Sequence, residues 1–215
     1  DVHALHQGYL RELRRRGGVV HCDCEVTRLE RDGSGWRVYV GDKVFAAPVV
    51  LNAAGAWADE VAEACGAAPL SIAPKRRTIV QLRVGRSGLK ELPLVDDAAG
   101  SFYFKGESDN SIWLSPHDEI PTDPCDAAPD EIDIATAIDR FEGAVDWPVE
   151  RVERSWAGLR SFAPDRLLVY GFDPAVPGFF WCAGQGGFGI QTAPAGSKLA
   201  AAILLGEAPD PMVEH

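Results

Sequence analysis

The sequence predicts a mixed α/β fold in two parts, one with buried parallel-type strands and one with an antiparallel-rich sheet and a single helix. Two observations carry this prediction. A short apolar run leads through a small-residue turn into a helical segment twice, at 48–65 and 179–205. Between them, residues 69–159 carry longer strand patterns and one helical stripe. We therefore expect one domain from residues 1–68 and 160–215 and a second from residues 69–159.

Composition and charge limit the possible functions. The chain of 215 residues is 46% hydrophobic and 25% charged, which is typical of a globular protein. Its formal net charge of −11 argues against binding to a nucleic-acid backbone or to an anionic membrane surface. We also expect no transmembrane segment, because no apolar run approaches the length that spans a bilayer.

The five cysteines are odd in number and scattered along the chain. This pattern favours free thiols in a reducing cytoplasm over a disulfide framework. Cys22 and Cys24 would share one face of a strand, but no cluster of histidines and cysteines accompanies them. We therefore expect no metal site.

Residues 1–68 are expected to hold two helices and several short strands. Apolar residues at helical spacing predict a helix over 3–16, which Gly17 and Gly18 end. Turn residues separate the strands, predicted at Val19–Cys24, Val26–Glu30, Trp36–Val40, Lys43–Ala46 and Pro48–Asn52. The last of these leads through Ala54 and Gly55 into a helix over Ala56–Cys65.

The second part opens with a long strand over Ile72–Val84, on which Arg76 and Arg77 point to alternate faces. Only one of these arginines can therefore reach a site on a given face. Further elements follow in order: strands at Phe102–Lys105 and Ile112–Leu114, a helix near 130–141 and a strand at Ser155–Ser161. The return segment is predicted to contain strands at Leu167–Gly171 and Phe179–Cys182 and a helix over Lys198–Leu205.

A glycine-rich loop precedes the last helix, with Gly184, Gly186, Gly187 and Gly189 inside six residues. Glycines suit a backbone in unusual torsions or in close contact with a ligand. The start of a helix adds unpaired N–H groups and a positive dipole end. The loop is therefore either a tight strand-to-helix turn or a site for an electron-rich group.

Three stretches resemble signature regions of the D-amino-acid oxidase/dehydrogenase superfamily of flavoproteins and occur in the family's order: Val49–Ala58, Ser155–Arg160 and Ala183–Ala195. Within that superfamily, four stretches are most similar to bacterial D-arginine dehydrogenases: Arg76–Thr78, Ser101–Lys105, Leu159–Phe162 and Gly184–Thr192. The resemblance implies a partial FAD-binding domain from residues 1–68 and 160–215 and a substrate-binding domain at residues 69–159. It also implies an enzyme that oxidises a D-amino acid, glycine or a sarcosine-like amine by hydride transfer from Cα to flavin N5.

The resemblance also assigns site residues. Arg160 is the first choice to bind the substrate carboxylate, with Arg77 as the second arginine, Tyr103 as a hydroxyl donor and Gly187 at the reacting centre. The implied FAD contacts are Val26, Ala54, Gly55, Arg160, Gly186, Gly187, Gly189, Ile190, Gln191 and Thr192. From the residues alone, a surface role for Arg160 and a packing role for Tyr103 stay open.

The chain departs from the family at its front. Relatives open with a βαβ unit whose Gly-x-Gly-x-x-Gly loop and helix start bind the FAD pyrophosphate. The glycine cluster here is expected not to have that spacing, and it lies near the other end of the chain. We therefore expect a missing N-terminal FAD-binding segment as a partner of this chain, and little FAD retention or activity by the chain alone. Two alternatives stay open: a flavin-dependent 2-hydroxy-acid oxidase or dehydrogenase, and a non-catalytic accessory domain.

Overall fold

The computed structural model describes residues 1–33 and 35–213, which divide into two compact units. The first unit comprises Asp1–Ala54, Ala58–Leu70 and Leu168–His215, and the second comprises Gly55–Trp57 and Ser71–Leu167. The expected domain boundary at residue 160 falls inside a strand that lies wholly in the second unit. The short 3₁₀ helix η1 (Gly55–Trp57) also belongs to the second unit.

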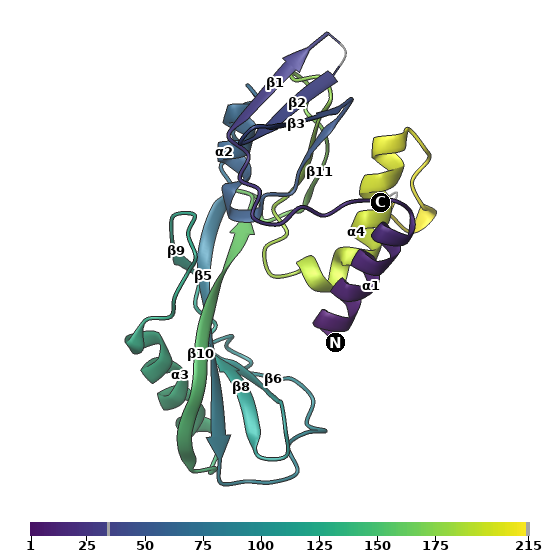
Figure 1. Cartoon of the computed structure of the whole chain (residues 1–215). Coiled ribbons are helices and arrows are strands. Elements are labelled where there is room, and N and C mark those ends of the chain that lie inside the picture. The colour runs from purple at the N-terminus through teal and green to yellow at the C-terminus, as the bar shows by residue number, and fades with distance from the viewer. Residues whose placement is uncertain (34, 214–215) are drawn as a thin grey trace. The chain divides into compact units, whose positions relative to one another are not determined.

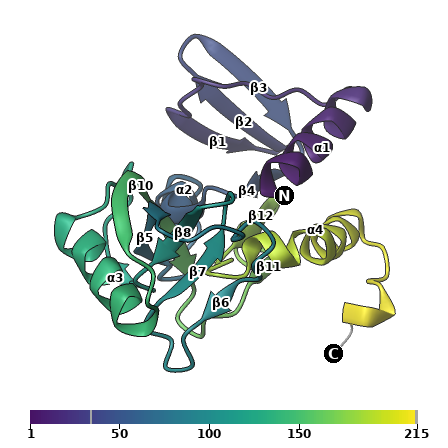
Figure 2. The same cartoon turned by 90° about the horizontal axis from the view of Figure 1, so that it is seen from below.

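The first unit contains two three-stranded sheets. One is an antiparallel meander, visible in Figure 2, of β1 (Arg28–Asp32), β2 (Gly35–Val40) and β3 (Lys43–Ala47). The other places β12 (Phe179–Ala183) between β4 (Val50–Asn52) and β11 (Val169–Phe172). In that sheet β12 pairs in parallel with β4 and antiparallel with β11. The parallel pairing predicted for the two short apolar segments is confirmed.

The helices of the first unit are α1 (Val2–Arg15), α2 (Ala58–Ala64), α4 (Gly189–Leu205) and the 3₁₀ helix η2 (Pro211–Val213). The predicted start of the last helix at Lys198 is wrong, because α4 begins at Gly189. The helix-favouring residues after Lys198 mark only the part of α4 with high intrinsic propensity. Gly189 and Pro194 have low propensity yet lie inside the helix.

The strand predicted at Val19–Cys24 does not form, and the strand predicted from Val26 begins at Arg28. β-branched residues favour a strand only where a partner strand offers pairing and packing, and this segment pairs with none in the described chain. Val19 is 69% exposed. Cys22 and Cys24 therefore do not share a strand face, and Val26 lies in irregular backbone.

The second unit is built on a six-stranded antiparallel sheet. Its central strand β5 (Ala73–Val84) pairs with β10 (Val149–Phe162) on one side along its whole length, as Figure 1 shows. The remaining strands, all on the other side of β5, are β8 (Ser111–Ser115), β7 (Tyr103–Gly106), β6 (Val95–Asp96) and β9 (Ile120–Pro121). The predicted Ser155–Ser161 strand is thus the second half of a longer one.

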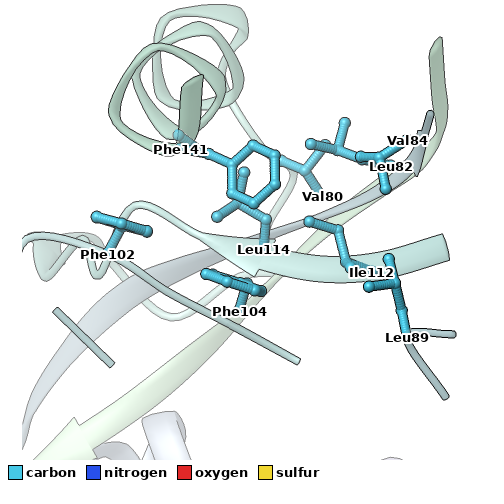
Figure 3. Packing of buried hydrophobic residues seen from close by; sticks show 10 residues of the cluster. Val80, Leu82, Val84, Leu89, Phe102, Phe104, Ile112, Leu114 and Phe141 are labelled. Atoms are coloured by element: carbon cyan, nitrogen blue, oxygen red, sulfur yellow. The ribbon is translucent and has the colours of Figure 1, made fainter. Parts of the chain in front are cut away.

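One face of this sheet packs on helix α3 (Glu131–Ala144) and forms the core of the unit. Every second residue of β5 points to that face, and Phe141 of the helix packs among them, as Figure 3 shows. The buried cluster on the sheet side comprises Val80, Leu82, Val84, Leu89, Phe102, Phe104, Ile112 and Leu114. Because side chains alternate along a strand, the intervening residues of β5 point to the opposite face.

The packing of the core predicts that a substitution at Phe141 lowers the free energy of unfolding strongly and that one at an exposed position of the same helix hardly changes it. Phe141 is 0% exposed and Ile132 is 70% exposed. We expect Phe141→Ala to lower the free energy of unfolding by about 3–5 kcal/mol, because it leaves a cavity, and Ile132→Ala to change it by about 0.5 kcal/mol or less. Urea unfolding followed by tryptophan fluorescence measures both. Equal losses in the two variants would contradict this packing.

Candidate functional site

The pairing of β5 and β10 places two arginines on the sheet face opposite the core. Gly158 lies directly opposite Arg77, and Arg160 lies opposite Lys75. Directly opposite residues of an antiparallel pair share a face, and alternate residues of a strand return to it. Arg77 and Arg160 therefore belong to one face. Gly158, which has no side chain, leaves space beside Arg77.

Arg76 points to the other face and serves the structure. Its Nη2 donates to a carboxylate oxygen of Asp133 at 2.7 Å and also to Asp130, at the start of α3. These carboxylates, Asp130 foremost, raise the pKa of Arg76 above its ordinary value. Of the two neighbouring arginines, Arg77 is the one that shares a face with Arg160.

The guanidinium of Arg77 is buried but only partly satisfied. The residue is 4% exposed, and its Nε donates to the carbonyl oxygen of Asp118 at 2.6 Å. Its Nη2 lies 3.7 Å from a carboxylate oxygen of Glu119. Neither Nη1 nor Nη2 has a hydrogen-bond partner among the described residues. A buried cation with unbonded donors is unfavourable, so the geometry suits an anionic ligand.

Arg160 and Tyr103 complete this group, which we call the arginine cluster (Arg77, Tyr103 and Arg160). Burial lowers the pKa of the Arg160 guanidinium, and the nearby charge of Arg77 lowers it further, whereas Tyr103 acts in the opposite direction. The guanidinium carbon of Arg77 lies 5.9 Å from the centre of the Tyr103 ring. Phe102 and Phe104 turn into the core, so Tyr103 lies on the opposite face, as the alternation predicts.

The loop that follows β8 holds the cluster in place. The Asp118 carboxylate accepts hydrogen bonds from the N–H and the hydroxyl of Thr78, each at 2.9 Å. Glu119 accepts from Arg166 at 2.9 Å and from Lys75 at 3.2 Å. These hydrogen bonds, that from Arg166 foremost, hold the pKa of Glu119 at about 2. Asp118 and Glu119 are not among the predicted site residues, although two adjacent carboxylates in the loop after the predicted strand Ile112–Leu114 are a visible signal.

His117 occupies the same loop and is also outside the predicted set. Its ring meets that of Tyr103 edge to face, with the centroids 5.4 Å apart and an interplanar angle of 85°. Its φ of 56° is in the left-handed region, which residues other than glycine adopt uncommonly. Its Nδ1 is buried and has no hydrogen-bond partner in the described part of the chain.

In the first unit, the glycine loop joins β12 to α4. Gly184 and Gly186 have φ values of 73° and 52°, which favour glycine. Gly189 has a different reason to be glycine, since a Cβ there would lie 3.0 Å from the Cβ of Gln185. Gly187 is exposed and is not in the left-handed region, so its small size leaves the backbone open to a ligand.

The start of α4 presents backbone donors among exposed apolar side chains. The N-cap residue Phe188 makes no side-chain capping bond, and the first N–H groups of a helix, here from Gly189 to Gln191, lack intrahelical partners. Phe188 and Ile190 are 52% and 56% exposed. The Thr192 hydroxyl donates to the Phe188 carbonyl at 2.8 Å, so it is used within the helix. This arrangement suits a flat, electron-rich ring.

The expectation that the glycine cluster lacks the dinucleotide-binding spacing is wrong, because Gly184, Gly186 and Gly189 match Gly-x-Gly-x-x-Gly. In those folds the helix leads into a second parallel strand. Here, within the residues that the structure describes, α4 is followed by the short helix η2 and by no strand. The spacing is therefore present without the βαβ unit in which it binds a pyrophosphate.

The other predicted cofactor residues lie on different segments. Val26 is 49% exposed. The Ala54 N–H donates to Oδ1 of Asn52 at 3.2 Å, and Nδ2 of Asn52 donates to the Ala58 carbonyl at 2.7 Å. Gly55 has a φ of 59°. Asn52, which is 2% exposed and not among the predicted residues, thus fixes the turn after β4.

Neither a metal-binding cluster nor a membrane-spanning helix is found among the described residues. The described chain holds no group of three or more histidine, cysteine, aspartate or glutamate side chains placed to bind a metal ion. All five cysteines are free. Across residues 1–33 and 35–213, none of the helices has the length and apolar character needed to cross a bilayer.

The two neighbouring arginines of β5 predict unequal effects on stability. Arg76→Met should lower the free energy of unfolding by about 1–3 kcal/mol, because Asp133 loses a charged partner. Arg77→Met should change it less, because the loss of its hydrogen bond to the Asp118 carbonyl and of its 3.7 Å ion pairs with Asp118 and Glu119 is offset by the removal of a buried charge with unbonded donors. Denaturant unfolding of each variant measures the difference. An equal loss for Arg77→Met would show that its charge is already satisfied.

The depressed pKa of Glu119 predicts an acid-sensitive contribution to stability. Its pKa falls from 4.5 to about 2 in the folded chain, so this contribution is complete above about pH 4.5 and is lost as the pH falls towards 2. Glu119→Gln should therefore flatten the dependence of unfolding free energy on pH in this range. Denaturant unfolding at a series of pH values measures the slope, and an unchanged slope would contradict the pairing with Arg166 and Lys75.

The chain matches a family of known proteins over most of its length. The family model "DAO: FAD dependent oxidoreductase" matches residues 1–203. The FAD-dependent oxidoreductase domain-containing protein 1 of Mus musculus is 28% identical over 249 residues, which cover 95% of this chain and 49% of that protein. The chain thus spans about half the length of such relatives.

Solved structures show the same fold. Glycine oxidase from Geobacillus kaustophilus has a TM-score of 0.77 and 26% identity, covering 89% of this chain and 50% of that one. Iminodiacetate oxidase from Chelativorans sp. BNC1 has a TM-score of 0.83 at 18% identity, covering 98% and 56%, and this likeness is one of fold. The match of the family model over nearly the whole sequence shows that the chain belongs to the DAO family of FAD-dependent oxidoreductases.

Proposed function

We propose that this chain supplies the carboxylate-binding site and the flavin-ring contacts of an FAD-dependent amino-acid oxidase or dehydrogenase. The observation that carries the proposal is the buried guanidinium of Arg77, whose two terminal nitrogens have no hydrogen-bond partner among the described residues while Arg160 lies nearby. The carboxylates of Asp118 and Glu119 approach this guanidinium to 3.7 Å and offset part of its charge, and a bound carboxylate would supply the missing hydrogen bonds.

The arginine cluster determines how the substrate is held. Arg160 forms the main fork to the substrate carboxylate, since a planar guanidinium matches the two oxygens with two hydrogen bonds. Arg77 donates from Nη1 and Nη2, and Tyr103 donates from its hydroxyl. Fixing the carboxylate also orients the adjoining Cα–H bond, which is the bond that breaks.

The glycine loop is proposed to contact the flavin of FAD, which supplies the hydride acceptor when bound. Gly186, Gly187 and Gly189 let the backbone approach the ring, and the N–H groups from Gly189 to Gln191 face its electron-rich edge. The predicted contacts from Val26, Ala54, Gly55, Ile190 and Thr192 remain part of this proposal. Because the loop lacks a βαβ context, we propose that tight FAD retention needs a dinucleotide-binding unit in addition to these residues.

The substrate is proposed to be a D-amino acid, glycine or a related amine. The likeness of Arg76–Thr78 and Leu159–Phe162 to D-arginine dehydrogenases supports the D configuration, and the 26% identity to a glycine oxidase supports a small amino acid. The free cysteines support a reducing compartment such as the cytoplasm.

Substitutions in the cluster test the proposal in the FAD-loaded protein. Arg160→Met should remove about 3–5 kcal/mol of transition-state stabilisation, because it breaks a charge-assisted contact. Arg160→Lys should recover little, since an ammonium cannot reproduce the fork. Tyr103→Phe should remove about 1–2 kcal/mol for one hydrogen bond to a charged group. The measurement is kcat/KM on D-amino acids, glycine and N-methylglycine.

Flavin absorbance should stay at the wild-type level in each variant, which separates substrate contact from cofactor loss. The matched control is Arg151→Met on the same strand, whose side chain is 63% exposed and pairs with Glu153. Near-normal turnover of every substrate by Arg160→Met would show that the amino-acid proposal is wrong.

A further inference from the structure

We propose that His117 is a positioning residue of the arginine cluster: its ring fixes Tyr103, and its protonation strengthens carboxylate binding. This inference rests on the proposed function, because it assumes that the cluster binds a carboxylate. It adds to the site a titratable group that neither the sequence pattern nor the family match assigns.

The first observation is the ring contact. The edge-to-face arrangement of His117 and Tyr103, with centroids 5.4 Å apart, restricts the rotation of the tyrosine ring that carries the hydroxyl. Tyr103 is otherwise only partly buried, on a face that lacks the close packing of the core. His117 is therefore well placed to determine where the Tyr103 hydroxyl points.

The second observation is the backbone that carries His117. A φ of 56° is unfavourable for a residue with a side chain and persists only where the surroundings enforce it. Here the His117 N–H donates to Oγ of Ser115 at 3.2 Å. On the preceding residue, the Pro116 carbonyl accepts from Nη1 of Arg140 at 2.7 Å. The loop is thus held from β8 and from α3, and it keeps the histidine at this position.

The third observation links His117 to Arg77. The next residue, Asp118, accepts the Arg77 Nε hydrogen bond through its carbonyl and the Thr78 N–H through its carboxylate. The same short loop therefore contacts Tyr103 through one residue and Arg77 through the next. A displacement of His117 would be transmitted to both Tyr103 and Arg77.

The fourth observation is the unpartnered Nδ1. A buried ring nitrogen normally bonds a carbonyl, a carboxylate or water, and an exception needs a reason. A Cβ on Gly100 would lie 3.8 Å from this nitrogen, so the loop before β7 passes close beside it without a side chain. A histidine with a purely structural role would be expected to bond through Nδ1.

The charged groups around His117 decide the sign of the effect. Three carboxylates lie on the segments packed around it, and each already accepts hydrogen bonds: Asp97 from Ser101, Asp118 from Thr78, and Glu119 from Lys75 and Arg166. The other ionisable groups are Arg77, Tyr103, Arg140 and Arg160. Protonation of His117 therefore adds positive charge to a group of cations and should strengthen the binding of an anion.

The first experiment needs no ligand. The chain is labelled with ¹³C in its tyrosine rings, and the Tyr103 signal is identified among the four tyrosines by Tyr103→Phe. We expect this signal to move between pH 5.5 and 8, where histidine side chains change charge, and to be stationary in His117→Phe. His117→Asn, which tolerates a left-handed backbone, serves as a second variant. A Tyr103 signal that does not move in the wild type would overturn the inference.

The second experiment titrates sodium propionate into the same labelled chain. We expect roughly fivefold tighter binding at pH 5.8 than at pH 8.0, from one added charge near the anion. His117→Phe should keep the affinity measured at pH 8.0 and lose the pH dependence. The control is His21→Phe in the first unit, a histidine that also makes a ring contact, with Phe45 at 5.0 Å. This variant should behave like the wild type.

The outcomes separate the two proposals. If propionate binding is lost in Arg160→Met but its pH dependence persists in His117→Phe, the His117 inference is wrong and the carboxylate site stands. If the wild type does not bind propionate, or binds it as well as Arg160→Met does, the carboxylate site is wrong and the inference falls with it.

Discussion

Two positive charges held close together on one sheet face are the constraint on which the site depends. Arg77 is buried with two unbonded terminal nitrogens, and its charge adds to the effect of Arg160's own burial in lowering the pKa of Arg160. The carboxylates of Asp118 and Glu119 lie 3.7 Å from the Arg77 guanidinium, but their hydrogen bonds go to Thr78, Arg166 and Lys75. They therefore offset part of the positive charge without bonding the terminal nitrogens of Arg77, which are left as preorganised donors for the proposed anion.

The candidate sites of the two units are built from different chemical groups. In the second unit, long charged side chains project from a rigid sheet, and a bonded loop fixes their positions. In the first unit, the proposed flavin contacts come from the backbone, since the glycines permit torsions and approaches that side chains would prevent. Under the proposed function, side-chain charge would discriminate the substrate, whereas main-chain donors suit a cofactor whose shape does not vary.

Local periodicity predicted much of this structure. The parallel pairing of β4 with β12 and the opposite faces of Arg76 and Arg77 follow from apolar runs and strand alternation. Alternation shows only that Arg76 and Arg77 point to opposite faces. That Arg76 is the one on the core face follows from its bonds to Asp130 and Asp133 at the start of α3. Val19–Cys24 has strand propensity but does not form a strand, because no partner strand lies beside it in the described chain. The presence of a partner strand depends on the tertiary structure and cannot be predicted from the local sequence.

The residues that sequence reasoning missed share a different cause. Asp118 and His117 act through a loop whose left-handed turn and long-range bonds leave little trace in composition. The start of α4 at Gly189 was hidden for a related reason, because glycine and proline oppose the helix that the rest of the unit enforces. Positions of low propensity or strained backbone are where local rules fail and where functional residues collect.

The alternation of β5 has a consequence for how the gene can change. Even-numbered positions of this strand hold the hydrophobic core, and odd-numbered positions hold the arginine site. Both therefore depend on the number of residues in the strand staying the same. One codon inserted near Thr78 would turn every later side chain of the strand to the opposite face and present Val80 and Leu82 to the solvent side. The same codon inserted in the connection after Val84 would alter neither face. Length variation should therefore accumulate in the loops of this unit and be absent from β5.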